Sequence, residues 1–182
     1  MKRGNMQTAT DEERRRWRRE HVDRFLTEIG LDRDRLAGST QTCLNEWARQ
    51  VKLVEDQPSS NFGNVVLQLC KAVESELAGG LGTIQALAFL NEGTLGQKAK
   101  NLEATKLDES AKQRLTSRGT KPGFVTSTLP KLLFSLAHLR SNTDAAHGNA
   151  EIQSANAQDA AVAHKLTGQI LQGIAAHPKG SK

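Results

Sequence analysis

The chain has 182 residues, of which 37% are hydrophobic and 25% are charged, and its formal net charge is +5 at pH 7. This length and apolar content suffice for one domain and a short appendage, which excludes a wholly disordered chain. No window reaches the roughly 18 uninterrupted apolar residues of a membrane span, and residues 1–20 lack the apolar stretch of a secretory signal. We therefore expect a soluble, cytoplasmic protein that makes no contact with membranes.

The positive charge is concentrated in the second half of the chain. Residues 1–35 carry ten basic and eight acidic side chains, so the arginine run at 14–19 is largely offset by nearby acids. Residues 36–96 have a net charge of −3, whereas residues 97–140 carry nine basic and three acidic side chains, a net charge of +6. A basic surface there is compatible with a phosphate-bearing partner, but charge alone does not establish one.

Apolar residues recur at spacings of three and four along most of the chain, which predicts helices. In the first half they form three stripes, namely Trp17, His21, Phe25 and Ile29; Leu44, Trp47, Val51 and Val54; and Phe62, Val65, Val66, Leu69, Val73 and Leu77. We expect these helices to end at Gly30, at the loop 56–60, and at the glycines of 79–82, which can adopt left-handed backbone without steric cost.

The second half is expected to contain shorter helices followed by two longer ones. Between residues 83 and 119 the pattern predicts short helices joined by turns, and residues 120–123 form a turn by composition. Thr128 is then predicted to cap a helix from Leu129 to about Asp144, with Pro130 in its first turn. The side of the last helix that faces the core is predicted to carry Val162, Ala163, Leu166, Ile170 and Ile174.

These elements predict an all-α fold, a bundle of about five or six helices. We divide it into an N-terminal helical extension at 1–60, a helical domain at 61–176 and a frayed tail at 177–182. Three roles are open for the extension: it completes the bundle, extends a dimer interface or contacts a partner.

The helix that begins at Leu129 changes character toward its end. When its apolar stripe is continued at spacings of three and four residues, the next positions are Arg140, Asp144 and His147. Seven residues complete nearly two turns, so Arg140 and His147 point the same way, about 10.5 Å apart along the axis. Burying such groups alone is unfavourable, and we expect them to line a cleft, to pair with each other's neighbours or to meet a second subunit.

Arginine and histidine together can support phosphodiester cleavage without a metal. The planar guanidinium suits a phosphate, and an imidazole with a pKa near 6.5 exchanges protons at neutral pH. In such a reaction the imidazole assists a ribose 2′-hydroxyl or protonates the leaving 5′-oxygen, and the guanidinium stabilises the charge on phosphorus.

At these residues the sequence resembles the HEPN superfamily. Residues 140–147, RSNTDAAH, match its R-x(4–6)-H motif with six intervening residues, and Gly148 continues the HG ending of abortive-infection and toxin-type members. Residues 69–77, LCKAVESEL, are similar to an early helix of such domains, and residues 94–97, TLGQ, resemble an LGQ turn that often precedes the motif helix. The resemblance spans roughly residues 62–175. It departs directly after the motif arginine. Many active members have a polar residue there, often Asn, whereas this chain has Ser141 at that position and Asn142 next.

The resemblance implies a HEPN-like bundle that dimerises through the motif face, so that two motifs form one composite site. It implies a metal-independent endoribonuclease without a cofactor, acting in antiviral defence or as a toxin. The catalytic candidates are Arg140 and His147, with Asn142 and Asp144 in support. The implied partners are RNA, a second copy of the chain, and an antitoxin or other defence-system protein.

Other functions are compatible with the same residues. One is a non-catalytic HEPN-fold module for nucleotide or RNA binding, dimerisation or regulation, and another is an unrelated helical interaction domain. Arg140 and His147 then only interact with the dipole at the end of their helix, with Gly148 as its cap. Glu74 either forms a salt bridge within the bundle or orients a motif side chain.

The remaining candidates are assigned structural roles. Cys43 and Cys70 lack CxxC spacing and are expected to be small buried hydrophobes. His138 and His164 lack the spacing of metal ligands and are expected to be exposed or paired within the fold. No metal or cofactor site is predicted.

Overall fold

The computed structural model describes residues 10–57, 62–141 and 155–175. All regular structure in this part of the chain is helical, which confirms the predicted all-α class. The seven α-helices of the described ranges exceed the predicted five or six. They are α1 (Asp11–Glu28), α2 (Gly38–Asp56), α3 (Gly63–Gly79), α4 (Leu95–Ala104), α5 (Glu109–Ser117), α6 (Leu129–Ser141) and α7 (Ala157–Ile174).

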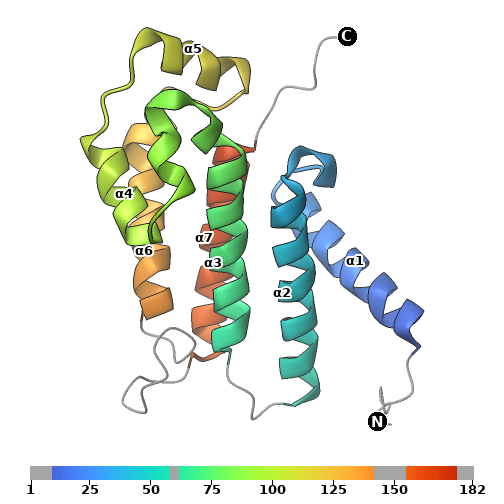
Figure 1. Ribbon diagram of the computed structural model, residues 1–182. Coiled ribbons are helices and arrows are strands. Elements are labelled where there is room, and N and C mark those ends of the chain that lie inside the picture. The colour runs from blue at the N-terminus through green and yellow to red at the C-terminus, as the bar shows by residue number, and fades with distance from the viewer. Residues whose placement is uncertain (1–9, 58–61, 142–154, 176–182) are drawn as a thin grey trace.

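The helices are arranged around α3 and α7, which pack against each other at the centre of the bundle (Figure 1). On one side α2 packs along α3, and α1 crosses it obliquely on the outside. On the other side lie α6 and α4, which pack against each other, while α5 lies at one end. None of the described helices is long and apolar enough to cross a bilayer.

The first two predicted helices are confirmed, and both contribute to the common hydrophobic core. Thr10 and Glu13 form a reciprocal capping box at the start of α1, which satisfies two backbone donors that would lack helical partners. The helix is followed by Gly30, whose φ of 69° favours glycine. Val22, Leu44 and Trp47 join the core cluster that also contains the α3 residues. Residues 10–57 thus help to complete the bundle.

The third helix is confirmed in its extent, but the prediction of left-handed glycines at its end is wrong. Helix α3 ends at Gly79, and none of the three glycines at 79, 80 and 82 has a positive φ. Gly80 instead has φ −92° and ψ −86°, and a Cβ there would lie 2.8 Å from the backbone oxygen of Glu76. The glycine is therefore needed for close backbone approach.

Residues 81–117 form the short helices that the sequence predicts. Two 3₁₀ segments, Leu81–Thr83 and Gln85–Asn91, lead into α4 and α5. Most of the apolar positions of these segments are buried, including Leu87, Leu90 and Leu115, which are fully inaccessible, whereas Ala88 is exposed.

The predicted start of the sixth helix is wrong. Helical structure begins at Pro122, and a π-turn, η5 (Phe124–Thr128), precedes α6 directly. Thr128 therefore lies inside the helical run and does not cap it. The N–H of Leu129 donates to the carbonyl of Phe124, five residues earlier. Pro130 lacks an N–H, and its ring crowds the carbonyl four residues before it; the wider π-turn relieves this crowding.

The last helix is confirmed, with one correction to its buried face. Val162 is 41% exposed, whereas Ala163, Ile170 and Ile174 are buried as predicted. The buried residues of α7 also include Ala160, Thr167 and Gly168, so its buried surface is richer in small residues than the predicted stripe.

Candidate functional site

Arg140 lies in the last turn of α6, at the end of a helix whose apolar side is embedded in the bundle. Leu129, Leu133 and Leu136 have no solvent exposure, and Leu139 is half-buried. This register carries the Arg140 side chain toward α3, with 32% of its surface exposed. As expected from the sequence, the apolar stripe of this helix ends at an ionisable side chain.

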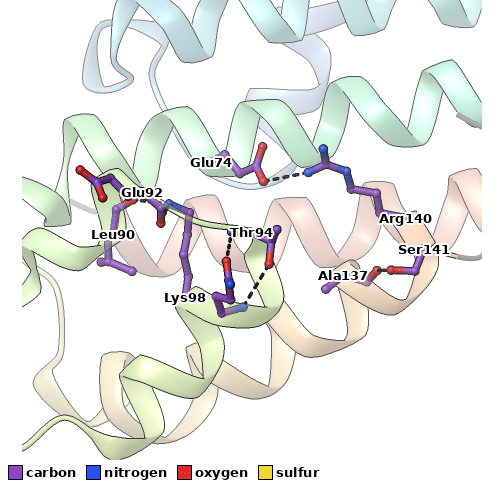
Figure 2. A network of polar contacts seen from close by, with 9 residues as sticks. Glu74, Leu90, Glu92, Thr94, Lys98, Ala137, Arg140 and Ser141 are labelled. Atoms are coloured by element: carbon purple, nitrogen blue, oxygen red, sulfur yellow. Dashed lines mark hydrogen bonds and ion pairs between the residues drawn. The ribbon is translucent and has the colours of Figure 1, made fainter. Parts of the chain in front are cut away.

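The guanidinium of Arg140 forms an ion pair with Glu74 of α3. Its Nη1 donates to Glu74 Oε1 at 2.8 Å, and the Glu74 side chain is 26% exposed (Figure 2). The pair joins residues 66 positions apart in the sequence. Of the two roles open for Glu74, the salt bridge within the bundle is therefore present, and this same contact fixes the direction of the motif arginine.

Cys70 lies one turn before Glu74 on α3, near the same pair. Its side chain is fully buried, and burial raises the pKa of the thiol to about 12, although the Arg140 charge acts in the opposite direction. At neutral pH the thiol is protonated and is a poor nucleophile. This confirms the assignment of Cys70 as a small buried hydrophobe. Cys43 is only half-buried, so the prediction that it is a buried residue is wrong.

The segment 94–97, expected to be a turn, is the first turn of α4. Thr94 is the N-cap, and its side chain and that of Gln97 form a reciprocal capping box (Figure 2). Gly96 faces α6, where a Cβ would reach van der Waals distance, 4.0 Å, from Ala137. These residues fix α4 against the helix that carries Arg140.

Lys98 is a buried cation beside this site that the sequence analysis did not identify. Only 3% of it is exposed, and its Nζ donates to the carbonyls of Leu90 and Glu92, the latter at 2.8 Å (Figure 2). Burial lowers the pKa of Lys98, whereas the Glu74 and Glu92 carboxylates raise it. Its position among the apolar residues of α4, three after Leu95, was the only sequence signal of burial.

The other motif candidates lie outside the described residues. These are Asn142, Asp144 and His147, which all follow the end of α6 in the sequence. Arg140 is thus the one predicted site residue that the structure places, and the segment containing His147 begins directly after its helix.

The remaining described histidines differ in environment. His138 is exposed on α6, and His164 of α7 is half-buried, with its ring 4.6 Å from that of Phe25 and 5.4 Å from that of Trp47. These environments agree with the expectation that both histidines are exposed or paired within the fold. Among residues 10–57, 62–141 and 155–175, no group of three His, Cys, Asp or Glu side chains is arranged to hold a metal ion.

Comparisons of the chain with protein-family models, curated proteins and solved structures found no match. The interpretation of the site therefore rests on its residues. A guanidinium oriented by a carboxylate and partly open to solvent can bind a phosphate, while proton transfer requires a further group.

Proposed function

We propose that the protein is a HEPN-type, metal-independent endoribonuclease that acts as a homodimer in antiviral defence or as a toxin. The observation that carries the proposal is the position of Arg140: it ends an apolar helix, is oriented by Glu74 and immediately precedes the segment that completes the R-x6-H motif. The net charge of +6 over residues 97–140 suits an RNA partner.

In this mechanism the ribose 2′-hydroxyl attacks the adjacent phosphorus and the bond to the 5′-oxygen breaks. The products are a 2′,3′-cyclic phosphate and a 5′-hydroxyl. His147 transfers a proton, either from the attacking hydroxyl or to the leaving oxygen, and Arg140 stabilises the additional negative charge on the phosphorane. Asn142 and Asp144 are supporting residues.

Glu74 serves in this proposal as a positioning residue. A guanidinium held at one nitrogen retains its planar fork in a defined orientation, which reduces the conformational entropy lost when a phosphate binds. Glu74 itself does not touch the reacting atoms.

The test is cleavage of RNA by the purified 182-residue chain in the presence of EDTA. The proposal predicts 2′,3′-cyclic phosphate ends, and loss of cleavage by at least about a hundredfold in His147→Ala, the lower range for removal of a general acid or base. Arg140→Ala should lose cleavage as well. The matched control is His138→Ala, because His138 lies on α6 two residues from Arg140 and is exposed. Unchanged cleavage in His147→Ala would refute the assignment.

The ion pair itself favours a second candidate function. Because Arg140 is already bound to Glu74, its role is compatible with a non-catalytic HEPN-fold module that binds nucleotides or RNA, or that dimerises. Expression separates the two: a ribonuclease toxin should slow growth of its host without an antitoxin, and Arg140→Ala should relieve that effect. A binding module should show neither effect, yet should still retain labelled RNA in a filter assay.

A further inference from the structure

A cluster of five rings joins α1, α2 and α7 on the side of the bundle away from Arg140. Trp47 of α2 stands at its centre, with ring centroids 5.0 Å from His21, 5.3 Å from Phe25 and 5.4 Å from His164. Trp17 stacks on His21 at 4.8 Å. Two of the five rings are therefore titratable, and they flank the same tryptophan from different helices.

The cluster attaches α1 to the bundle together with the buried Val22 and Leu26 and the ion pair of Asp23 with Arg33. Val22, Phe25 and Leu26 are the buried residues of this helix, while its other side carries charged residues exposed to solvent. Gly168 of α7 makes room for the helix end, because a Cβ there would lie 2.9 Å from Ile29 Cγ2 and 3.6 Å from the Phe25 ring. Unlike α3 or α7, which have packed neighbours on several sides, α1 lies at the edge of the bundle (Figure 1).

The charged groups around the two imidazoles act in both directions. Burial lowers the pKa of His21; Glu55 of α2 and Glu28 of α1 raise it, and Arg24 and His164 lower it further. Burial also lowers the pKa of His164, which Glu28 partly offsets. Lys52 of α2 adds a further positive charge 5.8 Å from the Trp17 ring.

From this geometry we propose that α1 is a pH-sensitive latch, docked on α2 and α7 while His21 and His164 are neutral and released when both acquire protons. Release exposes Trp47 and widens the neighbouring groove of about 580 Å³, whose apolar wall includes Val51, Val54, Phe62 and Val65. The rest of the bundle stays assembled, because the α2–α3, α3–α7 and α4–α6 contacts do not involve α1.

The direction of the switch follows from proton linkage. The docked state binds protons more weakly than a solvent-exposed imidazole with its pKa near 6.5, so docking is complete above that pH and weakens as the pH falls below it. Attraction between an imidazolium and the tryptophan faces favours docking and opposes the desolvation that lowers both pKa values. If release requires two protons, the ratio of docked to released protein changes by up to about a hundredfold per pH unit.

Intrinsic fluorescence reports on this cluster directly, since Trp17 and Trp47 are the two tryptophans of the chain and it has no tyrosine. Between pH 7.5 and 5 the 182-residue chain should show a red shift of tryptophan emission and faster amide exchange confined to α1. Quenching without a red shift would mean protonation without release, and this result would overturn the proposal.

Substitutions of the two histidines test the cause of the transition. His21→Phe/His164→Phe keeps the rings but cannot titrate, so emission and exchange should be independent of pH in this range. In each single variant, the ratio of docked to released protein should change by at most about tenfold per pH unit, instead of about a hundredfold. His138→Phe is the control, because its exposed imidazole lies on α6, and it should behave as the unsubstituted chain. A transition that persists in the double variant would overturn the proposal.

Two further variants separate loss of the switch from loss of folding. His21→Gln/His164→Gln removes titration without adding apolar volume and should give the same flat response if the phenylalanines disturb packing. Gly168→Ala should push α1 outward and move the transition to higher pH, while α3 and α7 retain their slow exchange. If Gly168→Ala leaves the transition midpoint unchanged, docking of α1 on α7 is not the event observed, and the proposal fails.

Discussion

Two corners of the bundle hold their helices by different kinds of contact. Where α3, α4 and α6 meet, the contacts between elements include the Glu74–Arg140 ion pair and the Lys98 ammonium on two carbonyls. Where α1, α2 and α7 meet, stacked and tilted rings make the contact. The first corner depends on the directions of a few polar atoms, and the second on the burial of large apolar surfaces.

The difference indicates where each corner is sensitive. A hydrogen-bonded cation must be matched atom by atom, so small changes there disturb the orientation of Arg140. Ring contacts tolerate small displacements, but their helix depends on the cluster remaining dry and uncharged. Four sets of substitutions test this contrast, beginning with the largest expected effect.

Truncating the central ring should have the largest effect. Trp47→Ala removes a side chain that is 4% exposed, and we expect a loss of about 3–5 kcal/mol in the free energy of unfolding. Urea denaturation followed by circular dichroism measures it. Leu53→Ala, on the same helix but 43% exposed, should change stability by no more than about 0.5 kcal/mol. Equal effects of the two substitutions would show that the rings do not anchor this corner.

Removing the buried cation should have the next largest effect. Lys98→Met keeps the length and apolar stem of the side chain but leaves the carbonyls of Leu90 and Glu92 without its donor, so we expect destabilisation of about 2 kcal/mol. Thermal or urea unfolding measures the loss. The control is Lys100→Met, two residues further along α4 and exposed. A Lys98→Met protein as stable as its parent would mean that release from desolvation compensates for the lost hydrogen bonds.

Neutralising the carboxylate of the ion pair should have a smaller effect on stability and a specific effect on the site. Glu74→Gln should cost about 1–2 kcal/mol, because the amide accepts a hydrogen bond but lacks the charge. If Glu74 positions Arg140, RNA cleavage should fall while Glu74→Asp restores part of it. Glu103→Gln, an exposed acid on α4, is the matched control. Activity that follows stability alone in these variants would argue against a positioning role.

The smallest effects compare the same capping chemistry at the two corners. Thr94→Ala removes the capping box of α4, and we expect a loss of about 1 kcal/mol in the global free energy of unfolding. Thr10→Ala removes the corresponding box of α1, where the adjoining turn is exposed, and should only increase fraying of that turn. Amide exchange distinguishes a loss of global stability from fraying confined to the first turn of α1. A global loss from Thr10→Ala would show that α1 unfolds together with the bundle.

The aromatic corner was the easier one to predict from the sequence. The stripes that contain Trp17, His21 and Trp47 follow the helical period, and burial of one face is what that period reports. The prediction gave their helices and not the contact of His21 with Trp47, since a stripe does not specify its partner helix. His164 was recognised only as a residue without metal-ligand spacing.

The polar corner shows why the candidate site was only partly predictable. Arg140 was identified because it continues an apolar seam within its own helix, which is local information. Its partner Glu74 lies 66 residues away, and Lys98 is buried through contacts with carbonyls that no side-chain pattern encodes. The start of α6 was misjudged for a similar reason: Thr128 and Pro130 match a cap and first turn, but the preceding backbone continues the helix.

The π-turn before α6 has a consequence for insertions and deletions in this chain. It contains one residue more than an α-helical path between the same two ends, so it acts as a built-in single-residue insertion. Deleting one residue, such as Ser127, would convert the segment toward α-helical hydrogen bonding and rotate Phe124 by about 100° relative to α6. Phe124 would then leave the notch that Gly173 provides on α7, where a Cβ would lie 2.1 Å from its ring. The length of this short segment therefore sets the alignment of the helix that presents Arg140.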